Sequence, residues 1–247
     1  MREMNKKNEI FDHTQRFSQE KEAREDSEKR QSREFPEKIE KSEKQGEIAE
    51  NQRKDDLKYD FWLASLTNIN SSKRIQVREL CGSAQAVYEL REETLKNMHL
   101  FTDNELQHLL ESRKKDLNRA WERFLGQNIQ MFPIGSKKYP QRLKDIAQPP
   151  YAIFCKGSMP DARKSVGIVG ARMCSEYGRS IATKLGKMLA GKDVQVISGM
   201  ALGIDSASHA GALQGKGSTF AVLGCGCDIC YPKNARNLYE NIQTSGG

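Results

Sequence analysis

Apolar residues recur at helical spacing between residues 58 and 126. Runs of this kind stand at 61–69, 75–80, 86–90 and 106–110, and the last leads into a charged stretch with Leu117, Trp121, Phe124 and Leu125 at i, i+4, i+7 and i+8. Thr102, followed by acidic residues, is a helix-start signal, and Gly126 marks an end. The pattern predicts a small all-helical domain over 58–126.

After Gly126 the pattern changes to short apolar runs punctuated by proline and glycine. Strands are predicted at 129–132 and 151–155, and three strand–turn–helix units follow with strands at 166–169, 194–197 and 219–223. The first of their helices carries one apolar face, made of Ile181, Leu185, Met188 and Leu189. The other two are expected at about 205–213 and 234–242. Strands alternating with helices predict an α/β fold with a parallel sheet over 127–247.

The charge is distributed unevenly along the chain. Residues 1–55 hold 14 Lys/Arg and 15 Asp/Glu, a net charge of −1, with few large apolar residues. Such a segment buries too little apolar surface to offset its ordering entropy, so we expect a disordered leader over 1–57, solvated in preference to acting as an interaction tail. The remaining 192 residues hold 26 Lys/Arg and 18 Asp/Glu, a net charge of +8. This basic balance in the part predicted to fold favours phosphate-bearing partners.

Several classes of protein are disfavoured by what the sequence lacks. No signal-peptide pattern opens the chain and no run approaches 18 apolar residues, which predicts a cytoplasmic protein without a membrane span. The six cysteines suit a reducing compartment as small apolar fillers. Cys225, Cys227 and Cys230 have no second ligand cluster at zinc-like spacing. We therefore expect packing or turn cysteines there, and no metal.

Glycine recurs in the turns after all three predicted parallel strands. The turns read Gly170-Ala171-Arg172, Ser198-Gly199 and Gly224-Cys225-Gly226. A parallel sheet places them at one edge, where glycine lets backbone N–H groups approach an anion and each following helix presents its positive end. Glycine also makes tight turns without any ligand. Three such turns, with Arg172 and Lys233 alongside, favour anion binding.

The anion is not predicted to be a dinucleotide. The first turn, 167–172, is not G-x-G-x-x-G, and the second strand ends at Ser198-Gly199 where a nicotinamide site needs an acidic residue. Asp193 precedes that strand, at the opposite edge. A dinucleotide oxidoreductase is therefore disfavoured.

Four further side chains have both a chemical and a structural interpretation. Asp205 and His209 share a helix face, but a capping aspartate with a packed or hydrogen-bonded histidine is favoured over acid–base chemistry. Cys174 lacks the histidine partner of a nucleophile, so no catalytic residue is predicted. For Tyr177 two roles stay open, stacking on a base or packing.

These motifs resemble the signature of the DprA/Smf family of DNA-processing proteins. The resemblance covers about 58–247, is most specific over 165–239, and rests on Gly170-Ala171-Arg172, 198–205 with His209, 221–224, Tyr231-Pro232 with Asn234, and upstream Tyr139-Pro140-x-x-Leu143, Pro149-Pro150 and Gly157. It implies a Rossmann-like DNA-binding domain at 127–247. A sterile-alpha-motif-like or helix-hairpin-helix-like domain would precede it at 58–126.

The resemblance also implies a non-catalytic function without a cofactor. Family members bind and protect single-stranded DNA in natural transformation and load the RecA recombinase. Arg172 matches the family's phosphate-contacting arginine, and the full set of implied DNA-binding residues is Gly170, Arg172, Ser198, Gly199, Gly203, Lys233, Asn234, Arg236 and Asn237. Residues 68–72 lack the glycines of a helix-hairpin-helix turn, which argues against DNA binding by the helical domain.

An alternative is a nucleotide-binding or nucleotide-cleaving enzyme of the phosphoribohydrolase type on a related scaffold. Such enzymes carry a Gly-Gly-x-Gly-Thr turn followed by glutamate, and this sequence contains none.

The resemblance further implies that the chain is C-terminally truncated relative to its family. Residues 245–247 look like the turn into a fourth core strand. One sheet edge and some apolar helix faces would then lack cover. The homodimer of full-length relatives is in that case less expected here.

Overall fold

The computed structural model describes residues 56–247. The predicted leader therefore lies outside the described residues, apart from positions 56 and 57, which are already helical. Within the described part of the chain, no helix is long and apolar enough to cross a membrane.

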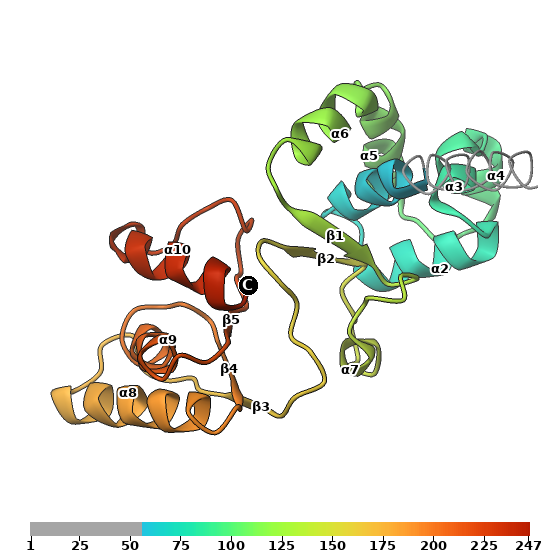
Figure 1. The fold of residues 1–247 in the computed structure, drawn as a ribbon. Helices are drawn as coiled ribbons and strands as arrows, with labels where there is room; N and C mark the ends of the chain where they lie inside the picture. The colour runs from blue at the N-terminus through green and yellow to red at the C-terminus, as the bar shows by residue number, and fades with distance from the viewer. Residues whose placement is uncertain (1–55) are drawn as a thin grey trace, which may run out of the picture. The chain divides into compact units, whose positions relative to one another are not determined.

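Residues 56–126 form an all-helical region, as the apolar runs predict (Figure 1). The carboxylate of Glu105 accepts from the N–H of Thr102, whose hydroxyl accepts from the N–H of Glu105 at 3.3 Å. This reciprocal capping box confirms the predicted start. The chain is helical over 56–65 and continues through α2 (Ser71–Cys81), α3 (Ala84–Glu89), α4 (Glu92–Asn97), α5 (Asp103–Arg113) and α6 (Leu117–Leu125).

The core of the helical region is built from large side chains. Trp62 is buried and meets the ring of Tyr88 edge-on. Leu80 and Leu125, which belong to the predicted apolar runs, are 64% and 58% exposed, and each lies in the last turn of its helix. The buried members of this core are Trp62, Leu63, Ala64, Leu66, Ile69, Val77, Ala84, Val87, Leu95, Leu106, Leu109 and Tyr151.

An antiparallel hairpin follows the helices. In it β1 (Gln130–Pro133) pairs with β2 (Ala152–Cys155), and α7 (Gln141–Lys144) lies in the long connection. Tyr151 precedes β2, is buried, and donates its hydroxyl to Asp60, which also pairs with Arg78 at 3.0 Å. Burial holds the pKa of Tyr151 well above its usual value, so the hydroxyl remains a donor. These three side chains join the hairpin to the helical region.

Residues 165–247 contain the predicted parallel sheet. β3 (Ser165–Gly167), β4 (Gln195–Ser198) and β5 (Thr219–Ala221) pair in that order, all parallel. α8 (Glu176–Ala190) and α9 (Ile204–Gln214) connect them, and the 3-10 turn η1 (Lys233–Ala235) and α10 (Arg236–Ser245) follow. The N–H of Ala221 donates to the carbonyl of Gly247 at 2.8 Å, so the last residues lie beside β5. The predicted α/β class, with helices before a parallel sheet, is confirmed.

The face of α8 that packs most closely is made of small residues. Three residues of the predicted apolar face, Ile181, Leu185 and Met188, are 37%, 41% and 51% exposed, whereas Leu189 packs against the cluster of Ala190, Val196 and Ala212. The buried residues of α8 are the small ones, Ala182, Gly186 and Ala190.

Glycines at the crossing of α8 and α9 explain this choice of face. A Cβ on Gly186 would lie 2.3 Å from the carbonyl oxygen of Ser208, and one on Gly211 would lie 2.1 Å from that of Thr183. The two helix backbones therefore approach to a distance that leaves no room for larger side chains. The small face of α8 packs against α9, and its large apolar face is left outside.

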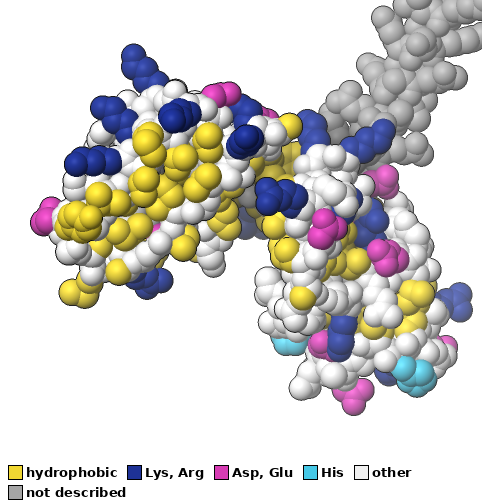
Figure 2. Space-filling view, turned by 90° about the horizontal axis from the view of Figure 1, so that it is seen from below, with side chains coloured by type: hydrophobic (Ala, Val, Ile, Leu, Met, Phe, Trp, Pro, Cys, Tyr) yellow, Lys and Arg dark blue, Asp and Glu magenta, His cyan; other side chains and the backbone are white. Residues whose placement is uncertain are grey.

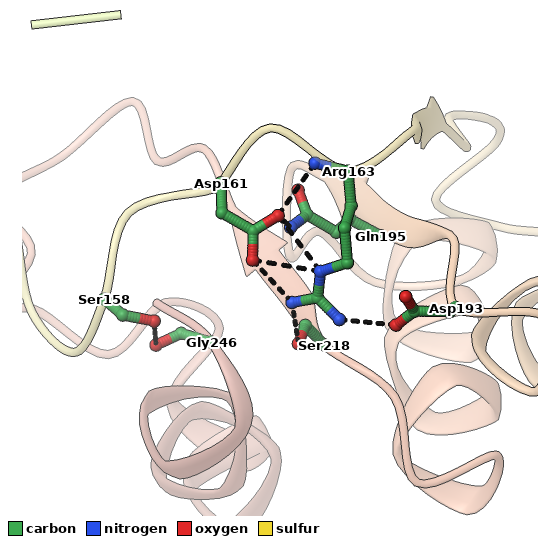
Figure 3. Close-up of polar contacts among 7 residues, drawn as sticks. All are labelled: Ser158, Asp161, Arg163, Asp193, Gln195, Ser218 and Gly246. Carbon is green, nitrogen blue, oxygen red and sulfur yellow. Dashed lines mark hydrogen bonds and ion pairs between the residues drawn. The ribbon is translucent and has the colours of Figure 1, made fainter.

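An ion-pair cluster ties together the amino ends of the three parallel strands (Figure 3). Arg163 precedes β3 and pairs with Asp161 at 2.8 Å and with Asp193, which precedes β4, at 2.6 Å. Its guanidinium also donates to the hydroxyl of Ser218, which precedes β5, at 3.1 Å. Hydrogen bonds from Arg163 lower the pKa of Asp161. Asp193 therefore lies at the amino edge, as the sequence predicts, and belongs to a structural cluster.

Candidate nucleic-acid interface

The three glycine-containing turns lie at the carboxyl edge of the parallel sheet. The first, 168–175, joins β3 to α8; the second, 199–203, joins β4 to α9; and the third, 222–232, follows β5. Gly167 pairs with Ile197, and Ser198 pairs with Ala221, so the turns start side by side. The predicted residues that this arrangement gathers are Gly170, Arg172, Ser198, Gly199 and Gly203.

Gly203 lets the second turn pack directly against the first. Its φ of 83° is left-handed, and a Cβ would lie 2.3 Å from the carbonyl oxygen of Ala171 and 2.5 Å from that of Arg172. The N–H of Ile204 donates to the same Ala171 carbonyl at 3.2 Å. Only glycine permits this contact, which holds the backbone that carries Arg172.

Asp205 lies buried beneath the two turns and bonds to both. Its Oδ1 accepts from the N–H of Gly170 and its Oδ2 from the N–H of Ala201, each at 3.4 Å. The predicted capping role is wrong, because the N-cap residue of α9 is Gly203 and the helix has no side-chain cap. Sequence reasoning missed the actual role because Gly170 lies 35 positions away in the chain.

His209 on α9 is fully buried beside β4 and β5. Its Nδ1 lies 2.7 Å from Oγ1 of Thr219, and that hydroxyl donates to the carbonyl of Val196 at 2.9 Å. Since the hydroxyl proton goes to the carbonyl, we assign the proton of the shared bond to Nδ1. Burial lowers the pKa of His209 to about 4, against smaller opposing effects of Asp205 and the Ser198 carbonyl. The expected packing and hydrogen bonding are confirmed, and the ring is withdrawn from solvent.

Arg172 extends from the first turn with a free side chain. It is exposed, and within residues 56–247 its guanidinium makes no hydrogen bond or ion pair. The carboxylate nearest in sequence, Glu176, pairs with Arg179 at 3.8 Å. A planar guanidinium with all its donors available is well suited to bind a phosphate.

The other predicted contacts lie beyond the third turn and are less closely assembled. Arg236 is engaged by Glu240 at 2.7 Å. The connection to the second turn is apolar, since buried Met200 shares a cluster with Tyr239 of α10. In the described part of the chain, no hydrogen bond or ion pair links this segment to the first two turns. Its predicted contacts, all exposed, are Lys233, Asn234, Arg236 and Asn237.

The cysteines of the third turn contact backbone oxygens. The Sγ of Cys225 lies 3.8 Å from the carbonyl of Ile229, and that of Cys230 lies 3.5 Å from the carbonyl of Pro232. Residues 56–247 contain no group of three or more His, Cys, Asp or Glu placed to hold a metal ion.

Two exposed side chains follow Arg172 in the chain, Met173 in the same turn and Tyr177 in the first turn of α8. Tyr177 is 77% exposed and Met173 is 96% exposed. Of the two roles left open for Tyr177, packing within the described residues is excluded by this exposure. Met173 had no assigned role, because an apolar residue in a turn gives no signal of its surroundings.

Comparison with known proteins identifies relatives of this α/β region. Residues 130–247 match the family model of DNA recombination-mediator protein A. DNA processing protein DprA of Bacillus subtilis (strain 168) is 35% identical over 139 residues, which make up 56% of this chain and 47% of that protein. DprA of Streptococcus pneumoniae is 38% identical over 123 residues, 48% of this chain and 43% of that protein. The chain thus spans less than half the length of either relative.

The fold has a counterpart among solved structures. The X-ray structure of DprA from Streptococcus pneumoniae aligns with a TM-score of 0.62 at 26% identity, covering 76% of this chain and 65% of that chain.

Proposed function

Since this chain belongs to the DprA/Smf family of DNA-processing proteins, we propose that it binds single-stranded DNA at the carboxyl edge of β3, β4 and β5. Binding is without catalytic turnover. Protection of the bound strand, delivery to RecA and a cytoplasmic location, which the resemblance implies, belong to the same proposal.

One observation carries the proposal: an unpaired Arg172 stands on a turn that the fold holds rigidly. Gly203 and Ile204 contact the first turn from one side, and Asp205 bonds its backbone from below. Because these contacts hold the backbone that carries Arg172, the turn itself loses little freedom when the guanidinium binds a phosphate, so the turn is preorganised for an anion. The net charge of +8 on residues 56–247 adds a long-range attraction for a polyanion.

The ionisable side chains at this edge favour ligand binding over catalysis. Asp205 and His209 are the ionisable pair beneath the turns, and both are buried and hydrogen-bonded. Neither is placed to reach a ligand above the turns. A nucleotide-cleaving activity therefore receives no support from the described residues.

The test is a salt titration of the full chain with labelled oligothymidylate, followed by fluorescence anisotropy. Each phosphate neutralised on a single strand contributes about 0.7 to the slope of log affinity against log salt. Arg172→Ala should lower the slope by about that amount and weaken binding roughly 10- to 100-fold, as expected for a lost charge-assisted hydrogen bond. Arg119→Ala is the matched control, because Arg119 is an exposed arginine on α6, in the helical region.

Three outcomes would contradict the proposal. One is the absence of binding, and another is equal or tighter binding of duplex DNA. The third is an equal loss of affinity in Arg172→Ala and Arg119→Ala, which would show that the loss comes from the lower net charge and not from a phosphate contact of Arg172. Competition by a nucleoside monophosphate at similar concentration would favour the nucleotide-enzyme alternative.

A further inference from the structure

The outward face of α8 carries an exposed apolar stripe. Figure 2 shows hydrophobic side chains gathered over this part of the α/β region, bordered by Lys and Arg. The stripe begins beside Arg172 and runs along the helix through Met173, Tyr177, Ile181, Leu185 and Met188. A contiguous exposed apolar surface of this kind is typical of a binding site for a ligand or another macromolecule.

The charges beside the stripe indicate the chemistry of its occupant. Arg179, Lys184 and Lys187 are exposed on α8, and Glu176 is its single acidic residue. Lys184 and Lys187 form no ion pair with any of the residues 56–247. Cations beside an apolar strip fit a ligand that is both polyanionic and rich in flat apolar groups, which describes a single nucleic-acid strand.

We propose that Tyr177, together with Met173, forms a stacking ledge for a base of the strand whose phosphate Arg172 holds. This rests on the proposed function and extends it from the backbone of the strand to its bases. A base must leave the duplex to reach a protein ring, so the ledge also selects single strands over duplex DNA. Every base has a flat face, so the ledge does not read sequence.

A second copy of this chain is a poorer occupant of the same stripe. A two-fold contact brings the same patch of both copies together. Lys184 and Lys187 would then face their counterparts with no carboxylate on α8 other than Glu176 to offset them. The charge pattern therefore favours the nucleic-acid strand.

The experiment compares oligothymidylate with an abasic oligonucleotide of the same length, which keeps the phosphates and lacks the bases. Tyr177→Ala should weaken oligothymidylate binding by about 5- to 100-fold, the effect of losing one base–aromatic stack. Its salt slope and its affinity for the abasic strand should stay unchanged. Tyr177→Phe, which keeps the ring, should bind as the wild type does. Leu80→Ala, which truncates an exposed apolar side chain on α2 outside the stripe, should also bind normally.

Cross-linking distinguishes direct contact between Tyr177 and a base from an indirect, structural effect of the substitution. Oligothymidylate containing iododeoxyuridine, irradiated in complex with the full chain, should attach to Tyr177 or Met173, as located by mass spectrometry. Attachment elsewhere, or an equal effect of Tyr177→Ala on both oligonucleotides, overturns the ledge while leaving the phosphate site at Arg172 intact. Self-association lost in both Tyr177→Ala and Met188→Ala, without a base-dependent effect, assigns the stripe to a second copy. Failure of the wild type to bind any single strand removes the proposed function and the ledge with it.

Discussion

The helical region at 56–126 and the packing of α8 and α9 on the parallel sheet, within the α/β region at 165–247, bury side chains of very different size. In the helical region Leu63, Val77 and Leu109 are fully buried. Where α8 and α9 meet the sheet, the buried apolar residues are Ala190, Val196 and Ala212. The first region gains stability mainly from the apolar area of large side chains, and the second from close backbone approach with many short dispersion contacts. Large apolar residues are thus buried in the core of the helical region, whereas at the crossing of α8 and α9 small residues are buried and the large apolar residues of α8 remain on the surface.

The helix crossing in the α/β region should be the feature most sensitive to one added methyl group. Gly211→Ala places a Cβ 2.1 Å from the carbonyl oxygen of Thr183, so α8 and α9 must separate to accept it. We expect a loss of at least about 3 kcal/mol in the free energy of unfolding, although alanine favours a helix by roughly 1 kcal/mol over glycine.

A helical glycine on α8 gives the matched control, whereas Gly211 lies on α9. A Cβ on Gly178 meets nothing closer than 3.4 Å, so Gly178→Ala should be neutral or slightly stabilising. Chemical denaturation of both variants measures the difference. Wild-type stability in Gly211→Ala would show that the two regions do not differ in the way described.

One substitution made in both regions tests the contrast directly. Leu109 is fully buried, and Leu185 is 41% exposed. Leu109→Ala should lower the free energy of unfolding by about 2–5 kcal/mol, whereas Leu185→Ala should lower it by less than about 1 kcal/mol. Both residues are helical, so helix propensity changes equally in the two variants. Similar losses by chemical denaturation would mean that the α8 stripe is covered in solution.

Lowering the pH should destabilise the α/β region more than the helical region, and this effect should be smaller than those of the substitutions above. His209 of the α/β region is buried with a pKa of about 4, while His99 and His108 of the helical region are exposed. The folded pKa lies below the unfolded value of about 6.5, so the unfolded state binds more protons between those values and stability falls as the pH drops. The linkage predicts a loss of about 2 kcal/mol at pH 5 relative to pH 7.

Hydrogen exchange read peptide by peptide should show this loss in the α/β region first. His209→Asn removes the titration and should flatten the dependence on pH between 7 and 5. If the helical region instead opens first in both proteins, His209 is not the acid-sensitive group.

Local chemistry made the helical region predictable from its sequence. Thr102 and Glu105 cap α5 through bonds three positions apart, and Val77 and Leu109 are buried within apolar runs of helical spacing. These interactions depend on residues that are close in the sequence, so they can be predicted from the sequence alone. The three parallel strands were equally readable, since their turns are marked by Gly170, Ser198-Gly199 and Gly224.

The face of α8 that packs against its neighbours could not be predicted in the same way. Its hydrophobic periodicity is correct for an amphipathic helix, yet it indicates which face is apolar and not which face a neighbour covers. Gly186 and Gly211 decided that, and they meet only after α8 and α9 have been brought together. The hairpin of β1 and β2 also escaped prediction, because short apolar runs do not indicate their pairing partners.

By itself the sequence determined most of the helices and strands, the α/β class and the gathering of three glycine turns at one sheet edge, although α4 and α7 were not predicted. Only the tertiary structure decided which residues far apart in the chain contact one another around those turns and at the opposite edge of the sheet. Asp205 bonds to Gly170 across 35 positions, and Arg163 joins the amino ends of three strands. Local spacing encodes hydrogen bonds and turns within a few residues, whereas contacts between distant residues exist only once the sheet has placed them side by side. The free Arg172 and the exposed Tyr177 follow from that second kind of information, because exposure is a property of the folded surface.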